Sequence, residues 1–124
     1  MAIQWFPGHM NKAKKAIAER IKSVDMVIEM LDARMPASSE NPLLAQLSKG
    51  KPKLKILNKQ DLADPERTRV WLEHYNSRQD TRAIALDSSE TGAHSKITQA
   101  CRAMIPHRQG IEKPLRVLIC GIPN

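Results

Sequence analysis

Aromatic residues and cysteines are scarce in this chain, and it contains no long apolar run. Its 124 residues include two tryptophans, one tyrosine, one phenylalanine and two cysteines. The core is therefore expected to be mostly aliphatic. Cys101 and Cys120 lie in apolar surroundings without C-x-x-C spacing, which predicts two reduced thiols in a cytosolic core. The chain has neither the apolar centre of a signal peptide nor a membrane-length segment, which favours a cytoplasmic location.

Metal-binding residues are not gathered at the spacing that metal sites use. The histidines are scattered along the sequence, at His9, His74, His94 and His107. No metal site is therefore predicted within these 124 residues.

Positive charge, by contrast, is in excess. Lysine and arginine number 20 against 13 acidic residues, which gives a net charge of +7. The excess is strongest in residues 10–24, where apolar residues recur at helical spacing and basic residues fill the opposite face. This basic helix suits a polyanionic partner, but an ordinary solvated helix face explains the same charges equally well.

Strand-like and helix-like segments alternate along the chain. This alternation predicts one α/β domain with a mostly parallel four-stranded sheet that is covered by helices on both faces. Asn41 and Asp64, each followed by proline, are predicted to cap two of the helices. The expected strands are residues 25–33, 53–58, 81–87 and 115–121, and the expected helices are residues 10–24, 41–50, 64–76 and 92–105.

Polar side chains and a glycine follow the ends of the expected strands, where ligands bind in parallel α/β sheets. The most informative group is Asn58, Lys59 and Asp61, directly after the strand "KLKILN". A carboxylate at position 61 has two acceptors that match the N1–H and N2–H₂ donors of guanine. Adenine would leave that carboxylate unpaired, at a cost of about 1–3 kcal/mol.

The other two residues of this group fit the same ligand. Asn58 can serve the O6 and N7 side of a guanine base, and the methylene stem of Lys59 can lie over its flat face. N-K-x-D is therefore interpreted as a guanine-recognition element. A chance tetrapeptide is the alternative, because Asn and Asp are also common in turns that follow strands.

The segment after the third expected strand is a second candidate for base recognition. A backbone N–H of Ser88 or Ser89 could donate to guanine O6. In guanine-binding proteins the usual pattern of this loop is Ser-Ala-Lys. Only Ser88 matches it, because Ser89 replaces the alanine and Glu90 replaces the lysine. A serine-rich helix cap explains this segment equally well.

The last ten residues, "LRVLICGIPN", have the form of a strand that enters a phosphate-binding loop. Gly121 would be the first glycine of G-x-x-x-x-G-K-[ST], and Pro123 and Asn124 would follow it in that loop. The base-recognition residues thus precede the phosphate-binding loop along the chain. In most P-loop proteins that bind guanine nucleotides, the phosphate-binding loop comes first.

In this order the chain resembles the circularly permuted GTPases of the YlqF/YawG class. The resemblance implies a three-layer Ras-like P-loop GTPase fold with the last strand beside the first. It divides the chain into a basic helix (9–24), a base-recognition half (25–112) and the start of the phosphate-loop strand (115–124). The segments that carry the resemblance are "IQWFPGHM" at 3–10, "DARMP" at 32–36, "NPLL" at 41–44, "LNKQD" at 57–61 and "GIPN" at 121–124.

The resemblance also implies GTP hydrolysis coupled to late assembly of the large ribosomal subunit, with GTP or GDP as ligand. The switch regions, the Mg²⁺ ligands and a further RNA-binding domain are expected after Asn124, so residues 1–124 alone are not expected to hydrolyse GTP well. The basic helix is expected to contact rRNA, and the open edge of the last strand predicts self-association. The alternatives are a basic α/β RNA-binding module and a small-molecule transferase.

The N-terminal segment supplies one catalytic candidate. By resemblance, His9 is a candidate to position the water that attacks GTP. A helix cap or a surface position is the other reading of a single histidine here. Trp5 and Phe6 are predicted to be packing anchors. Asp32, Arg34 and Pro36 match the "DARMP" segment and are predicted to shape the turn after the first strand.

Overall fold

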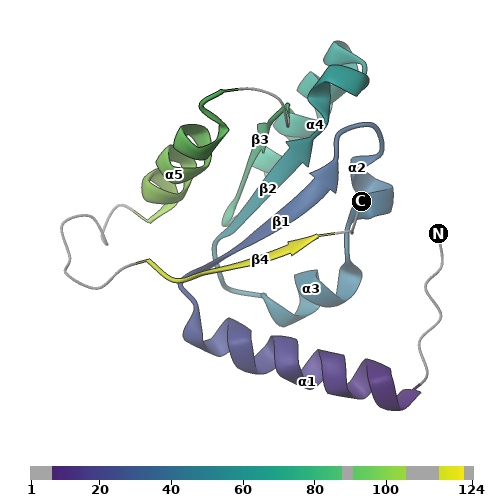
Figure 1. Ribbon diagram of the computed structural model, residues 1–124, viewed down its shortest axis with the longest axis vertical. Helices are drawn as coiled ribbons and strands as arrows, with labels where there is room; N and C mark the ends of the chain where they lie inside the picture. The colour runs from purple at the N-terminus through teal and green to yellow at the C-terminus, as the bar shows by residue number, and fades with distance from the viewer. Residues whose placement is uncertain (1–6, 88–90, 106–114, 122–124) are drawn as a thin grey trace.

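The computed structural model describes residues 7–87, 91–105 and 115–121, with side chains from Lys14 onward. Helices and strands alternate along the chain, as the sequence predicts (Figure 1). Its elements are α1 (Pro7–Ser23), β1 (Met26–Asp32), α2 (Pro36–Ser39), α3 (Pro42–Leu47), β2 (Lys53–Asn58), the 3₁₀ turn η1 (Gln60–Leu62), α4 (Pro65–Asn76), β3 (Thr81–Ala85), α5 (Ala93–Met104) and β4 (Val117–Gly121).

The four strands form one parallel sheet in the order β3-β2-β1-β4 (Figure 1). β1 is an inner strand that pairs with β2 on one side and with β4 on the other. The predicted neighbourhood of the last and first strands is thus confirmed. The direction of strand addition reverses between β1 and β4, and ligands of open α/β sheets bind beside such a reversal.

Helices cover both faces of the sheet, which gives the three layers predicted from the sequence. α5 packs on one face, where Ile28 and Ile56 meet Cys101 in an aliphatic cluster. On the opposite face α4 covers Leu31 and Leu57, while α1 and α3 cover Val27. Alternating residues of β1 therefore serve opposite clusters, as the pleat of a strand requires.

The two predicted helix caps are present. The side-chain oxygen of Asn41 accepts a hydrogen bond from the Leu43 N–H at 3.0 Å, and that of Asp64 accepts one from the Glu66 N–H at 3.0 Å. Each cap is followed by a proline, which needs no hydrogen-bond partner for its missing N–H. These local signals fix where α3 and α4 begin.

The segment after β1 differs from the expected turn. Pro36 is buried and begins the short helix α2, whose residue Ser39 uses its hydroxyl to accept a hydrogen bond from the Asp32 N–H at 3.1 Å. α3 ends at Leu47, and Gly50 lies in the following turn with a φ of 88°. Burial of Pro36 and the bond from Asp32 to Ser39 stabilise a helical turn that its sequence alone does not signal.

Both cysteines have the surroundings that the sequence predicts. Cys101 is buried and Cys120 is half-buried, and neither forms a disulfide. Burial raises the pKa of both thiols. Among residues 7–87, 91–105 and 115–121, no helix has the length and apolar character that crossing a membrane requires.

Candidate functional site

The carboxyl ends of β1 and β2 bring two of the sequence motifs together. Asp32 and Asn58 are paired across the parallel ladder. The Ala33 N–H donates to the Asn58 carbonyl at 2.8 Å, which extends the pairing one step past the strand ends. The "DARMP" turn and the N-K-x-D loop are therefore direct neighbours at this edge of the sheet.

The N-K-x-D loop turns sharply at Lys59. This residue has φ 62° and ψ 37°, in the left-handed region that residues with a side chain seldom adopt. Immediately afterwards the Gln60 N–H donates to the Leu86 carbonyl at 3.1 Å, and the Leu86 N–H donates to the Leu57 carbonyl at 2.9 Å. The loop is thus fixed by backbone bonds to the segment that follows β3.

Within this fixed loop, the Asp61 side chain is available to a ligand. Asp61 lies in η1 and is exposed, whereas Asn58 is half-buried at the end of β2. In the described part of the chain, neither side chain makes a hydrogen bond or ion pair. A carboxylate fully bound by its own protein could not recognise a base, so an accessible Asp61 is a requirement of its predicted role, which stays a prediction.

Asp32 is fixed by Arg34, two residues along the chain. Its Oδ1 accepts hydrogen bonds from the Arg34 N–H at 2.9 Å and from Arg34 Nε at 3.0 Å, and its Oδ2 accepts one from Arg34 Nη2 at 2.7 Å. These bonds, aided by the charge of nearby Lys59, lower the pKa of Asp32 to about 2. The turn is thus shaped by Asp32 and Arg34, as predicted, through a bidentate ion pair that the spacing alone does not reveal.

Gly121 ends β4 where that strand runs beside β1. It is paired with Met30, and a Cβ at position 121 would lie 2.8 Å from the Met30 Cβ and 3.2 Å from the Met30 carbonyl oxygen. Contacts this short require the strands to shift. Close strand packing therefore accounts for glycine here, in addition to the predicted role at the start of a phosphate-binding loop.

Several predicted site residues fall outside what the structure describes. Ser88, Ser89, Pro123 and Asn124 lie outside the described residues, and so does the side chain of His9, whose backbone belongs to α1. Their predicted roles stay predictions. Among the described residues, no group of three or more His, Cys, Asp or Glu side chains could hold a metal ion.

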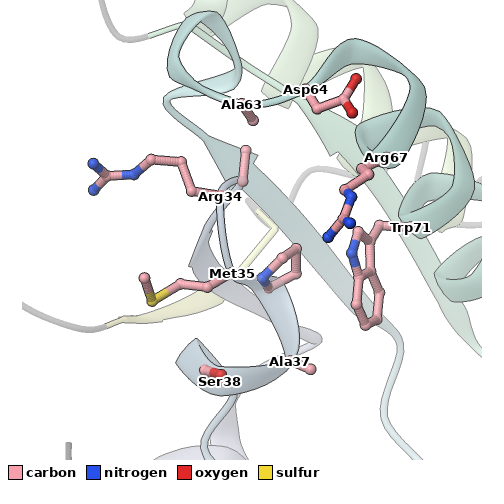
Figure 2. A pocket seen from close by; sticks show the side chains of 10 residues that line it. Arg34, Met35, Ala37, Ser38, Ala63, Asp64, Arg67 and Trp71 are labelled. Carbon is pink, nitrogen blue, oxygen red and sulfur yellow. The ribbon is translucent and has the colours of Figure 1, made fainter.

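A cleft that sequence reasoning missed lies between the α2 segment and the start of α4 (Figure 2). Its volume is about 160 Å³. Residues 33–38 line one side and Ala63, Asp64, Arg67 and Trp71 line the other; the side chains of Arg34 and Met35 point away from Trp71 (Figure 2). Arg67 and Trp71 are four residues apart, which places both on one face of α4. This spacing is the sequence feature that could have indicated a binding surface there.

Comparison with known proteins gives relatives over the whole chain. It is 39% identical, over 100% of its length and 46% of the relative, to "Ribosome biogenesis GTPase A" of Priestia megaterium. It is 37% identical, over 98% of its length and 31% of the relative, to "Short integuments 2, mitochondrial" of Arabidopsis thaliana. It is 56% identical, over 49% of its length and 19% of the relative, to "Mitochondrial ribosome-associated GTPase 1" of Mus musculus.

Because this chain covers only part of each relative, the properties of a whole relative cannot be assigned to it. No family model matches it. The chain spans less than half the length of the relatives to which it is similar over its whole sequence. The similarity therefore concerns only the part of each relative that matches these residues, and the activity of a whole relative does not follow from it.

Proposed function

Because the chain is homologous over its whole length to proteins named ribosome biogenesis GTPase A, we propose that it is the guanine-recognition part of a circularly permuted GTPase. The observation that carries this proposal is the exposed Asp61 carboxylate, unpaired among the described residues, in a loop held rigidly at the carboxyl edge of the sheet. Such an edge is where nucleotides bind in parallel α/β folds.

In the proposed complex, Asp61 accepts hydrogen bonds from N1–H and N2–H₂ of guanine. Asn58 faces the O6 and N7 side of the base, and the Lys59 stem covers its flat face. The backbone bonds of Gln60 and Leu86 hold this geometry before the ligand arrives, so little ordering is needed on binding. Backbone N–H groups near Ser88 and Ser89 complete the contacts to O6.

The phosphates of GTP or GDP would extend from the base toward the end of β4. β4 lies beside β1, and Gly121 leaves room for a close backbone approach at the strand end. Gly121, Pro123 and Asn124 are proposed to begin the phosphate-binding loop, and Mg²⁺ is proposed to accompany the nucleotide in the whole GTPase. Residues 1–124 alone are proposed to hydrolyse GTP poorly, since the groups around the γ-phosphate dominate phosphoryl-transfer catalysis.

The cellular role we propose is late assembly of the large ribosomal subunit. The names of the relatives associate them with ribosome biogenesis and with mitochondrial ribosomes. The exposed face of α1 carries Lys14, Lys15, Arg20 and Lys22, which suits contact with rRNA phosphates. His9, in the first turns of that helix, is proposed to position the attacking water when the whole GTPase is present.

The decisive experiment exchanges the carboxylate of Asp61 for an amide. Asp61→Asn should weaken GDP binding and strengthen xanthosine diphosphate binding, because the amide donates where xanthine has a carbonyl and guanine has an amino group. A preference reversal of at least roughly tenfold is expected, equivalent to about 1.4 kcal/mol. Calorimetry or NMR titration with GDP, xanthosine diphosphate and ADP measures it.

Asp64→Asn is the matched control for this exchange. Asp64 lies three residues further on and caps α4, a role that asparagine also fills. This variant should keep the original preference for GDP. Equal losses for both nucleotides in Asp61→Asn, or equal binding of GDP and ADP by the unaltered chain, would overturn the guanine-recognition model and favour the basic RNA-binding module.

A further inference from the structure

The cleft between the α2 segment and α4 is separate in chemistry from the proposed guanine site. Its floor and walls include small or apolar side chains, among them Ala33, Pro36 and Ala63. Arg67 and Trp71 line its α4 side, whereas the Arg34 side chain points away from them (Figure 2). An apolar floor beside one guanidinium group and an indole ring suits a flat, aromatic, negatively charged ligand.

Trp71 is held in place before any ligand arrives. Its ring stacks on Tyr75, with 5.7 Å between the ring centroids and 25° between the planes. It also meets His74 edge to face at 5.7 Å. Tyr75 is itself fully buried in the cluster under α4, so the indole rests on the core while part of it lines the cleft.

Arg67 supplies a positive charge at the cleft that its own protein does not neutralise in the described part of the chain. Arg67 is exposed and has no ion pair or hydrogen bond of its side chain among the described residues. Arg34 uses Nε and Nη2 on Asp32, and its side chain is still 43% exposed. The acidic residue of the lining, Asp64, uses its carboxylate to cap α4. Asp32 neutralises Arg34, so Arg67 is the guanidinium group of the lining that is left to bind a negatively charged ligand.

We propose that this cleft docks a single-stranded segment of RNA, with one base stacked on Trp71 and a flanking phosphate bound by Arg67. A volume of about 160 Å³ accommodates one base. Aromatic rings and arginine planes are the groups by which proteins hold unpaired bases, and the net charge of +7 attracts the polyanion from a distance. An acidic peptide with an apolar anchor is the competing occupant that the experiment must separate.

This docking goes beyond nucleotide recognition, and it does not require the guanine site. The two are nevertheless adjacent, because Ala33 lines the cleft and its N–H bonds the Asn58 carbonyl of the N-K-x-D loop. Measuring GDP binding on the same variants distinguishes failure of one proposal from failure of the other.

Tryptophan fluorescence tests the stacking directly. The chain has two tryptophans, so a Trp5→Phe background leaves Trp71 as the single emitter. Titration with a ten-nucleotide single-stranded RNA of mixed sequence should quench Trp71 emission with the same midpoint as the anisotropy change of the labelled RNA. A duplex of the same sequence should quench it much less, because its bases are already stacked.

Charge variants then test the phosphate contacts. Arg67→Ala should weaken RNA binding by roughly tenfold and reduce the slope of log affinity against log salt by about 1. Arg82→Ala, which removes an exposed arginine of β3 outside the cleft, is the control of equal charge and should change affinity by less than about twofold. Trp71→Leu keeps an apolar side chain against the core and should abolish the stacking contribution.

Three results would overturn the proposal. One is RNA binding, seen by anisotropy, that leaves Trp71 emission unchanged, since the RNA would then bind elsewhere, for example on α1. Another is an equal loss for Arg67→Ala and Arg82→Ala. The third is a Glu-rich peptide with a leucine anchor that quenches Trp71 while the RNA does not. If the circular dichroism spectrum of Trp71→Leu shows that this variant is unfolded, the quenching of Trp71 by RNA and the RNA affinity of Arg67→Ala still test the proposal.

Discussion

Lys59 combines a strained backbone with a proposed ligand contact. Its φ of 62° belongs to a region that costs a residue with a Cβ about 1–2 kcal/mol, and that glycine adopts freely. The strain persists because the bonds on either side, from Ala33 to Asn58 and from Gln60 to Leu86, fix the loop ends. Strain that is held in this way is common at ligand sites.

Replacing Lys59 with glycine should therefore separate stability from binding. Lys59→Gly is expected to leave the free energy of unfolding unchanged or up to about 1 kcal/mol higher, because relief of strain offsets the added flexibility of the unfolded chain. GDP binding should weaken, since the stem that covers the base is gone. Lys59→Ala keeps the backbone strain, so it should weaken GDP binding without any increase in the free energy of unfolding. Urea unfolding and calorimetry on the two variants check this, and a glycine variant less stable than the alanine variant would contradict it.

The ionisation of Asp32 makes the free energy of unfolding depend on pH in the acidic range. Hydrogen bonds from Arg34 lower its pKa from 3.8 to about 2 in the folded chain. A lowered folded-state pKa contributes stability above the unfolded pKa, and this contribution is lost as pH falls from about 4 to about 2. Asp32→Asn should therefore cost stability at pH 6 and much less at pH 2.5. Urea unfolding at both pH values measures the difference, and an equal cost at both would exclude this linkage.

Residues differ in how far the sequence predicts their roles. The place of Asn58, Lys59 and Asp61 followed from an apolar strand that ends in a polar motif. The bidentate geometry of Asp32 and Arg34 did not, because short-range ion pairs depend on the backbone path of the turn. Trp71 was counted only as part of a helix, and its exposure to a cleft depends on where α2 packs.

At the scale of elements, the strands and long helices were predicted to within a few residues. β2 was predicted with its observed bounds, and α4 begins one residue after the predicted Asp64 cap. Hydrophobic periodicity and capping residues are local features, so they can be recognised from the sequence alone. α2 and η1 were missed, since each is a single turn tied to residues outside it, α2 through the Ser39–Asp32 hydrogen bond and η1 through the Gln60–Leu86 hydrogen bond.

The pairing of β4 with β1 gives an element-scale prediction. Gly121→Ala places a Cβ 2.8 Å from the Met30 Cβ, and neither atom can rotate away. We expect a loss of about 1–3 kcal/mol in the free energy of unfolding, with faster hydrogen exchange of the β4 amides. Ile119→Thr, an exposed β-branched residue on the same strand, is the control and should cost far less. Equal costs for the two variants would mean that the close approach does not constrain the strand.

At the scale of the whole molecule, a buried ion pair joins the two clusters on the helix-rich face of the sheet. Lys55 on β2 and Glu29 on β1 are directly paired in register, and each is only 4% exposed. Glu29 Oε2 also accepts a hydrogen bond from the Asn41 N–H at 2.8 Å, at the start of α3. Lys55 Nζ lies 6.0 Å from the centre of the Tyr75 ring on α4. The pair thus links two strands and two helices.

This arrangement explains how a strand with two lysines fits a sheet that helices cover on both faces. "KLKILN" alternates charged and apolar residues, as a strand with one solvated face does. Helices nonetheless cover both faces of the sheet, and Lys55 is buried because Glu29 on the neighbouring strand neutralises it. That compensation involves residues 26 positions apart, so no local pattern contains it.

A double-mutant cycle tests how much the molecule depends on this pair. Lys55→Met leaves the Glu29 carboxylate buried without its cation, and it should cost about 3–5 kcal/mol in the free energy of unfolding. Lys55→Met combined with Glu29→Gln removes both charges and keeps a carbonyl oxygen for the Asn41 N–H, so it should be more stable than Lys55→Met alone. Urea unfolding of the four proteins gives a coupling energy, expected at about 1–3 kcal/mol. Additive costs would show instead that the two charges act independently, and that the junction of the clusters depends on apolar packing around them.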